Sequence, residues 1–194
     1  MPETAVLHEV SPAAERSTDE AHPLRVLFVC TGNTCRSPMA EAVARHLLEE
    51  RRLALPELLR ELTVPEFEVS SAGLYAAEGE PITENACKAL EAAGIEPLPP
   101  RDYRAHRAHR LTAEDAACCD LLVGMTPEHA LELMMRFPQI ASRVRTMPRP
   151  IPDPFGGDEA VYRASLAAIT DGVKELLFSA PSDAPSGGEG ATNG

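Results

Sequence analysis

The stretch Val26-Leu27-Phe28-Val29-Cys30-Thr31-Gly32-Asn33-Thr34-Cys35-Arg36-Ser37-Pro38-Met39 decides the fold of this chain. It begins with an apolar run, typical of a central strand in a parallel sheet because both faces of such a strand are buried. After a short polar loop, Ser37 and Pro38 are typical of a helix start, with Ser37 as the N-cap. Ligands bind at the carboxyl ends of parallel strands, so the loop after Cys30 is predicted to hold a ligand.

This loop has the composition of a site for an oxyanion beside a thiol. Backbone N–H groups that lead into a helix N-terminus form an anion-binding concavity. Gly32 lets the backbone approach a ligand closely, and Asn33 tolerates unusual backbone angles. Arg36 has planar paired donors that match two phosphoryl oxygens. The field that attracts the anion also stabilises the thiolate of Cys30, the predicted nucleophile. The predicted phosphate-binding residues are Thr31, Gly32, Asn33, Thr34, Cys35 and Ser37.

Strand and helix patterns alternate along the rest of the chain. Strands are predicted at 24–29, 67–71, 120–125 and 144–147, and helices from 38, at 83–93, after 112, at 127–137 and at 158–178. This order predicts an α/β fold, a three-layer sandwich in which helices cover both faces of a four-stranded parallel sheet. The leucines of 51–65 predict an extra helix, inserted between the first helix and the second strand.

Composition limits the class of protein. The chain has 194 residues and a net charge of -12, so general nucleic-acid binding is not expected. We predict one domain over 24–179, with a disordered acidic tail over 1–23 and a second disordered tail over 180–194. No apolar stretch is long enough for a membrane span and no secretory signal is present, which favours the cytoplasm and free thiols. We expect a monomer that needs no metal or other cofactor.

Several segments resemble the low-molecular-weight protein tyrosine phosphatases. Val-Cys-Thr-Gly-Asn-Thr-Cys-Arg-Ser-Pro-Met-Ala-Glu, over 29–41, is similar to their phosphate-binding loop. Ile-Pro-Asp-Pro-Phe-Gly-Gly, over 151–157, is similar to their later Asp-Pro-aromatic motif. The resemblance extends from about 24 to 178, includes 69–73 and 102–112, and is lost at 51–65 and in both tails. It implies the flavodoxin-like fold of that family, a nucleophile at Cys30 and a phosphoryl clamp at Arg36.

A thiolate that attacks phosphorus needs a nearby acid to protonate the leaving group. Cys30 lies so close to the start of the chain that this acid is expected downstream, which independently favours Asp153. The flanking prolines stiffen its loop. We expect a phosphocysteine intermediate, hydrolysed by water that Asp153 activates. The resemblance also implies that Tyr75, Phe155 and Thr34 line the substrate cleft.

Thr34 is the residue on which the expected substrate depends. Tyrosine-directed members of the family usually carry a larger apolar residue there, whereas members resembling bacterial protein arginine phosphatases carry Thr. Guanidine is also a more basic leaving group than phenol, with a pKa of about 12.5–13.8 against about 10, so it depends more on protonation. We therefore expect phosphorylated proteins as partners and phosphoarginine as the substrate group, with phosphotyrosine as the alternative.

Other classes of function remain as alternatives. Thiol-dependent arsenate reductases use a similar loop with further cysteines, but Cys118 and Cys119 are adjacent and Cys87 lies mid-helix, so all three are predicted to be small buried residues. A non-catalytic phosphate-binding module is disfavoured by the intact set of Cys30, Arg36 and Asp153.

Two smaller groups of residues also carry predictions. Cys35 is predicted to protect Cys30 by forming a reversible disulfide with it. His106 and His109 are interpreted as part of a solvated basic loop, because no matching metal ligands lie nearby in the sequence.

Overall fold

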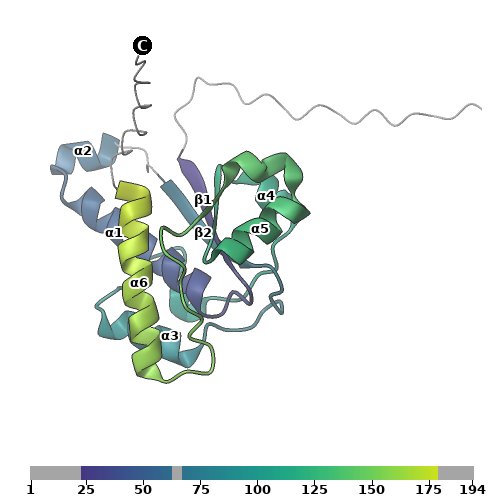
Figure 1. The fold of residues 1–194 in the computed structure, drawn as a ribbon. Coiled ribbons are helices and arrows are strands. Elements are labelled where there is room, and N and C mark those ends of the chain that lie inside the picture. Colours follow the sequence, from purple (N-terminus) through teal and green to yellow (C-terminus); the bar gives the residue numbers. More distant parts are fainter. Residues whose placement is uncertain (1–22, 63–66, 179–194) are drawn as a thin grey trace, which may run out of the picture.

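The computed structural model describes residues 23–62 and 67–178, which form a parallel sheet covered by helices (Figure 1). The four strands are β1 (Leu24–Cys30), β2 (Phe67–Gly73), β3 (Leu121–Gly124) and β4 (Val144–Thr146). The helices are α1 (Arg36–Leu53), α2 (Glu57–Leu62), α3 (Glu84–Ala92), α4 (Ala113–Cys118), α5 (Pro127–Arg136) and α6 (Glu159–Phe178), with 3-10 turns at Tyr103–Ala105 and Pro138–Arg143. The predicted α/β architecture with a four-stranded parallel sheet is confirmed.

The sheet has a layer of helices on each face. In Figure 1, α1, α3 and α6 lie on one side of the strands, and α4 and α5 lie on the other. Successive residues of β1 point to opposite faces, as the pleat of a strand requires. Val26 and Phe28 therefore join the core beneath α1 and α6, whereas Leu27 and Val29 join the core beneath α4 and α5. Burial on both faces explains the continuous apolar run of β1.

The strand order places Cys30 where ligands bind in this class of fold. The order is β2-β1-β3-β4, so the chain runs from β1 to one neighbour and then crosses back to the other. In open parallel sheets the crevice beyond the carboxyl ends at such a reversal is the usual ligand site. Cys30 is the last residue of β1, and it lies opposite Gly73, the last residue of β2.

Two details of the predicted helices were wrong. The first helix begins at Arg36 rather than after Ser37, and no side chain caps it. Ser37 is not the N-cap because its hydroxyl lies inside the protein, within hydrogen-bond distance of Cys30, Asn33 and Ala72. The predicted extra helix before β2 is present as α2, but its bounds differ: among the described residues of the segment, 51–53 continue α1 and Glu57–Leu62 form α2.

Other predicted helix ends agree with the structure. Thr112 and Asp115 form a capping box at α4, and Gly94 follows α3 at a positive φ of 71°. The predicted tails lie outside the described residues except for residue 23, and the domain limits stay a prediction.

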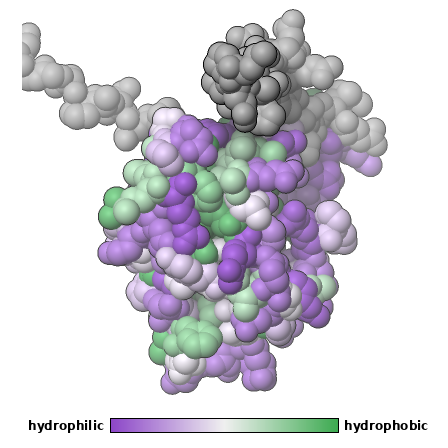
Figure 2. Space-filling model, turned by 90° about the vertical axis from the view of Figure 1, so that its right-hand side faces the viewer, coloured by the Kyte–Doolittle hydropathy of each residue, from purple (hydrophilic) through white to green (hydrophobic). Residues whose placement is uncertain are grey.

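The face of the molecule on the α4 and α5 side is mainly polar (Figure 2). Figure 2 views the molecule from the α4 and α5 side and shows hydrophilic residues over most of that face. Leu131 and Met135 are exposed hydrophobic residues of α5. Within 23–62 and 67–178, no helix combines the length and the apolar character that crossing a membrane requires.

Candidate active site

Asn33 organises the loop between β1 and α1. It is fully buried and has a positive φ of 56°, a conformation that asparagine tolerates better than most residues. Its backbone N–H points at Cys30 Sγ, 3.3 Å away. Its side-chain amide donates to Ser37 Oγ at 2.9 Å and to Ser71 Oγ at 3.0 Å. The left-handed turn at Asn33 thus brings a backbone donor to the sulfur, as predicted for an anion-binding loop.

Ser37 supplies the second contact to the sulfur. Its Oγ lies 3.1 Å from Cys30 Sγ and 3.2 Å from the carbonyl oxygen of Ala72. The hydroxyl has only one hydrogen, so it can donate to only one of these two acceptors at a time. A thiolate at Cys30 is the stronger acceptor because it is charged. Together with the Asn33 N–H, the Ser37 hydroxyl is therefore a hydrogen-bond donor available to the sulfur of Cys30.

A buried chain of side chains holds Asn33 in place from behind. Ser71 accepts a hydrogen bond from the Asn33 amide and donates its own hydrogen to Glu41 Oε2 at 2.7 Å. Glu41 is 7% exposed, and its other oxygen lies 3.6 Å from Arg101. Asn33 donates to Ser71, and Ser71 donates to Glu41, so the buried polar side chains beneath the loop have hydrogen-bond partners.

Arg36 combines burial with one unused donor. Its side chain is 6% exposed, and Nη2 donates to Asp153 Oδ2 at 2.6 Å. Among the described residues, Arg36 Nε is one of two buried side-chain polar atoms with no hydrogen-bond partner. A buried guanidinium N–H without an acceptor is costly, which points to an acceptor that a ligand supplies. The residue predicted as the phosphoryl clamp therefore has a free donor at the loop.

Asp153 reaches Arg36 from the other end of the chain. Its loop is fixed by bonds on both sides: Ile151 N–H donates to the Met125 carbonyl at 2.9 Å, and Ser165 Oγ donates to the Pro152 carbonyl at 3.3 Å. The Asp153 side chain is 52% exposed, so its carboxyl faces solvent while it contacts the buried Arg36. The structure thus brings together Arg36 and the predicted acid, 117 residues apart in the sequence.

The remaining loop residues lie as follows. Thr31 has its hydroxyl 3.5 Å from Arg36 Nη2. Thr34 is 9% exposed, with its Oγ1 3.7 Å from Cys35 Sγ and its carbonyl accepting from Thr83 N–H at 2.9 Å. Cys35 is buried and lies 3.2 Å from the hydroxyl of Tyr162. Burial is the larger cause and the contact with Cys35 the smaller one that raise the pKa of Tyr162 to about 12, so the phenol stays protonated.

Tyr75 and Phe155, the residues predicted to line the cleft, are both exposed. Tyr75 follows β2, and its backbone N–H donates to the Thr31 carbonyl at 2.9 Å, which places the residue beside the loop. Its ring lies beneath the Arg136 guanidinium, 4.6 Å away, and its hydroxyl donates to Glu132. Phe155 is 74% exposed, two residues after Asp153, and its N–H donates to that carboxyl at 3.2 Å. Their role in substrate binding stays a prediction.

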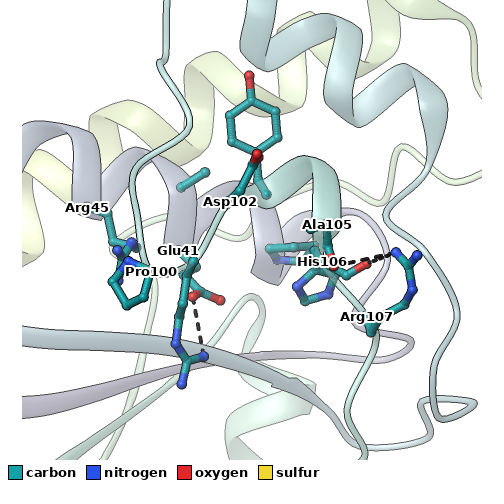
Figure 3. A pocket seen from close by; sticks show the side chains of 11 residues that line it. Glu41, Arg45, Pro100, Asp102, Ala105, His106 and Arg107 are labelled. Carbon is teal, nitrogen blue, oxygen red and sulfur yellow. Dashed lines mark hydrogen bonds and ion pairs between the residues drawn. The ribbon is translucent and has the colours of Figure 1, made fainter.

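His106 was misjudged from the sequence as a solvated residue. It is partly buried, and its Nε2–H donates to the Asn33 carbonyl at 2.8 Å. Burial lowers the pKa of His106, so the neutral ring is favoured. Figure 3 shows His106, Glu41 and Arg107 around a cavity of about 290 Å³. Neither Cys30 nor Asp153 lines this cavity, so it lies apart from the nucleophile.

The other cysteines differ from the prediction in part. Cys119 is buried, and burial raises the pKa of its thiol to about 11, which keeps it protonated. Cys87 is half-buried, but Cys118 is exposed, because it ends the short helix α4 at the surface. In the part of the chain that the structure describes, no three His, Cys, Asp or Glu side chains form a metal-binding group.

The fold and the site define a class of protein. A thiol at the end of a central strand, a loop with a backbone N–H pointing at its sulfur, and a buried arginine paired with a carboxyl are parts that a cysteine-based phosphatase requires. The comparisons agree. The family model of low molecular weight phosphotyrosine protein phosphatase matches residues 25–184, and the chain belongs to this family. It is accordingly a protein phosphatase, a hydrolase with phosphorylated proteins as substrates.

Individual relatives fall into two groups by name. A protein-arginine-phosphatase of Geobacillus stearothermophilus is 38% identical over 165 residues, which cover 80% of this chain and 97% of the relative. The low molecular weight protein-tyrosine-phosphatase PtpB of Staphylococcus epidermidis is 30% identical, covering 80% and 98%. Among solved structures, the YwlE arginine phosphatase from Geobacillus stearothermophilus is 36% identical, with a TM-score of 0.63 over 79% of this chain and 90% of that one. This structural match confirms the flavodoxin-like phosphatase fold.

Proposed function

We propose that the protein hydrolyses phosphoproteins through a phosphocysteine intermediate, with Cys30 as nucleophile, Arg36 as clamp and Asp153 as acid and base. The observation that supports this most directly is the buried Nε of Arg36, a donor without an acceptor at the start of α1, directly after the loop in which the Asn33 N–H points at Cys30 Sγ. A phosphoryl oxygen is an acceptor of matching charge and geometry.

The first step forms a bond between Cys30 Sγ and phosphorus and breaks the bond from phosphorus to the leaving atom. The loop N–H groups and Arg36 stabilise the equatorial oxygens, and the protonated Asp153 donates its hydrogen to the leaving atom. In the second step Asp153, now a carboxylate, removes a proton from water. This water attacks phosphorus, the sulfur–phosphorus bond breaks, and Cys30 returns to the thiolate with release of inorganic phosphate.

The substrate group that we propose is protein phosphoarginine, with phosphotyrosine as the second candidate. The argument for phosphoarginine is Thr34, a small hydroxyl-bearing residue in the loop, together with the 38% identity to a protein-arginine-phosphatase. A guanidine leaving group also requires a close carboxyl, and Asp153 stands at the clamp. The argument for phosphotyrosine is the group of relatives named protein-tyrosine-phosphatases, at 30% identity.

Matched peptides test this choice. Turnover of a phosphoarginine peptide and a phosphotyrosine peptide of otherwise identical sequence is compared for the wild type and for Thr34→Ile. We expect the wild type to prefer phosphoarginine and the variant to shift toward phosphotyrosine. A wild-type preference for phosphotyrosine would overturn the substrate assignment, whereas full activity in Cys30→Ser or Asp153→Asn would overturn the mechanism.

We also propose that Cys35 protects the nucleophile by reversible disulfide formation with Cys30. Both thiols are buried, and Cys35 lies in the same short loop as Cys30. Mass spectrometry after mild peroxide treatment tests this. The disulfide should form and be reversed by thiols, and over-oxidation of Cys30 without it would contradict the proposal.

A further inference from the structure

His129, in the first turn of α5, connects to the catalytic loop through Thr31. Its side chain is largely buried, and both ring nitrogens have hydrogen-bond partners. Nε2 lies 3.1 Å from Thr31 Oγ1, and Nδ1 lies 2.8 Å from Thr126 Oγ1. Thr31 Oγ1 is in turn 3.5 Å from Arg36 Nη2. A continuous path of hydrogen bonds therefore runs from the clamp to the start of α5.

The hydrogens along this path have only one consistent arrangement. The Thr126 hydroxyl hydrogen-bonds the carboxylate of Glu128, an acceptor only, and this contact lowers the pKa of Glu128. The single hydrogen of Thr126 is thereby used, so Thr126 Oγ1 accepts from His129, and the hydrogen of the neutral ring is on Nδ1. Nε2 is then an acceptor, and Thr31, which accepts from Arg36, donates its own hydrogen to Nε2. The path thus ends on a carboxylate with every hydrogen used once.

We propose that His129, neutral and with its hydrogen on Nδ1, is a positioning residue that holds Thr31 and through it Arg36 in the orientation for phosphoryl capture. The inference rests on the proposed function, because it assigns His129 a role in the orientation of the proposed clamp. His129 acts through Thr31 and does not itself take part in bond making.

The surroundings of His129 favour the neutral ring. Four charged groups act on it: Arg36 from α1, Asp153 from its loop, and Glu128 and Glu132 from α5 itself. Burial lowers the pKa of His129, and the Arg36 charge lowers it further, while the three carboxylates act in the opposite direction. Protonation would place a hydrogen on Nε2, remove the acceptor for Thr31 and add a cation near Arg36. The positioning role is therefore lost at acidic pH.

The test compares two substitutions that differ in whether they leave an acceptor. His129→Leu keeps an apolar side chain of moderate size and removes both nitrogens, whereas in His129→Gln the amide oxygen reaches about as far as Nε2. The probes are inorganic phosphate, titrated by calorimetry, and para-nitrophenyl phosphate turnover. For His129→Leu we expect phosphate affinity and kcat/KM to fall about tenfold, as for one hydrogen bond to a charged network. His129→Gln should stay within about threefold of the wild type.

A double-mutant cycle separates this role from general packing. Thr31→Val should cost about as much as His129→Leu, and the double variant should cost about as much as either one, because all three break the same path. The pH profile gives a second readout. Wild-type kcat/KM should decline on acidification with an inflection that His129→Gln lacks, and His46→Gln, a surface control on α1, should keep the wild-type profile.

Three results would overturn the inference: additive losses of kcat/KM in the double variant, an equal loss of kcat/KM in His129→Gln and His129→Leu, or a kcat/KM of His129→Leu within twofold of the wild type. Melting temperatures identify any variant that fails to fold. Failure of the proposed function gives a different result. A wild type that binds phosphate but does not hydrolyse it refutes that function, and phosphate affinity still tests His129.

Discussion

Gly73→Ala is expected to disable the enzyme by pushing the catalytic loop out of place. A Cβ atom on Gly73 would lie 2.8 Å from the Thr31 carbonyl oxygen and 2.9 Å from the Asn33 nitrogen. Gly73 cannot move back, because its N–H donates to the His109 carbonyl and its carbonyl accepts from Leu111 N–H, each at 2.9 Å. The loop must therefore yield rather than β2.

The size of the effect follows from these distances. Ordinary contact requires Thr31 and Asn33 to retreat by about half an ångström. Overpacking of this kind costs about 1–3 kcal/mol in the free energy of unfolding. Misplacement of catalytic groups by 1 Å costs about a hundredfold in rate, so a shift of half that size is expected to lower kcat/KM by about tenfold or more.

The assay is para-nitrophenyl phosphate turnover, alongside urea unfolding. Gly172→Ala, on α6, is the matched control, because its new Cβ would meet the flexible end of the Met147 side chain at 2.6 Å rather than the backbone of the loop. We expect the control to change stability alone. If Gly73→Ala kept the kcat/KM of the control, the loop would not depend on the close approach of β2, and the reasoning would be refuted.

Three further outcomes are expected. Burial lowers the pKa of His106, so on acidification the histidine is protonated in the unfolded chain before it is protonated in the folded one. The free energy of unfolding should therefore fall as the pH drops below about 6.5. Urea midpoints measure this fall, and His106→Gln should weaken the dependence of stability on pH. Ser37→Ala should slow turnover about tenfold to a hundredfold, because it removes a 3.1 Å contact with Cys30, and an unchanged rate of alkylation of that thiol by iodoacetate would contradict this. Tyr162→Phe removes a contact with Cys35 and should lower the melting temperature by about 3 °C with turnover preserved, as calorimetry and the same turnover assay would show.

Features encoded within one short segment were predictable from the sequence. The apolar run of β1 and the proline after the polar loop predicted the strand and the approximate helix start, and the loop between them stays a predicted ligand site. Asp153 was predicted as the acid from a chemical requirement, since the predicted nucleophile lies so early that its acid was expected downstream. The structure shows that the Asp153 carboxyl contacts Arg36, and its role as the acid stays a prediction. These predictions depended on neighbours in the sequence or on the chemistry of the reaction, and neither needs the tertiary structure.

The residues that support the loop were not predictable in this way. Glu41, Ser71, His106 and His129 reach it from four different segments, and the alignment of β1 with β2 and β3 decides which of them meet Asn33 and Thr31. A histidine in a basic stretch gives no local sign that it will be buried. Ser37 was misassigned for the same reason, because its capping pattern is local while its actual partners are not.

The pairing of Arg36 with Asp153 has a consequence for how the enzyme meets its substrate. The chain has a net charge of -12, so at long range it repels a phosphoprotein, and at 2.6 Å the carboxylate cancels the charge of the clamp. Beyond a Debye length of about 10 Å at 0.1 M salt, the site offers no positive charge to attract an anion. In the proposed mechanism, capture is therefore a contact event in which the phosphoryl dianion replaces the carboxylate at Arg36. The exchange frees the Asp153 carboxylate from its cation, and it can then take up from solvent the proton that the leaving group requires, so arrival of the substrate and release of the acid are linked.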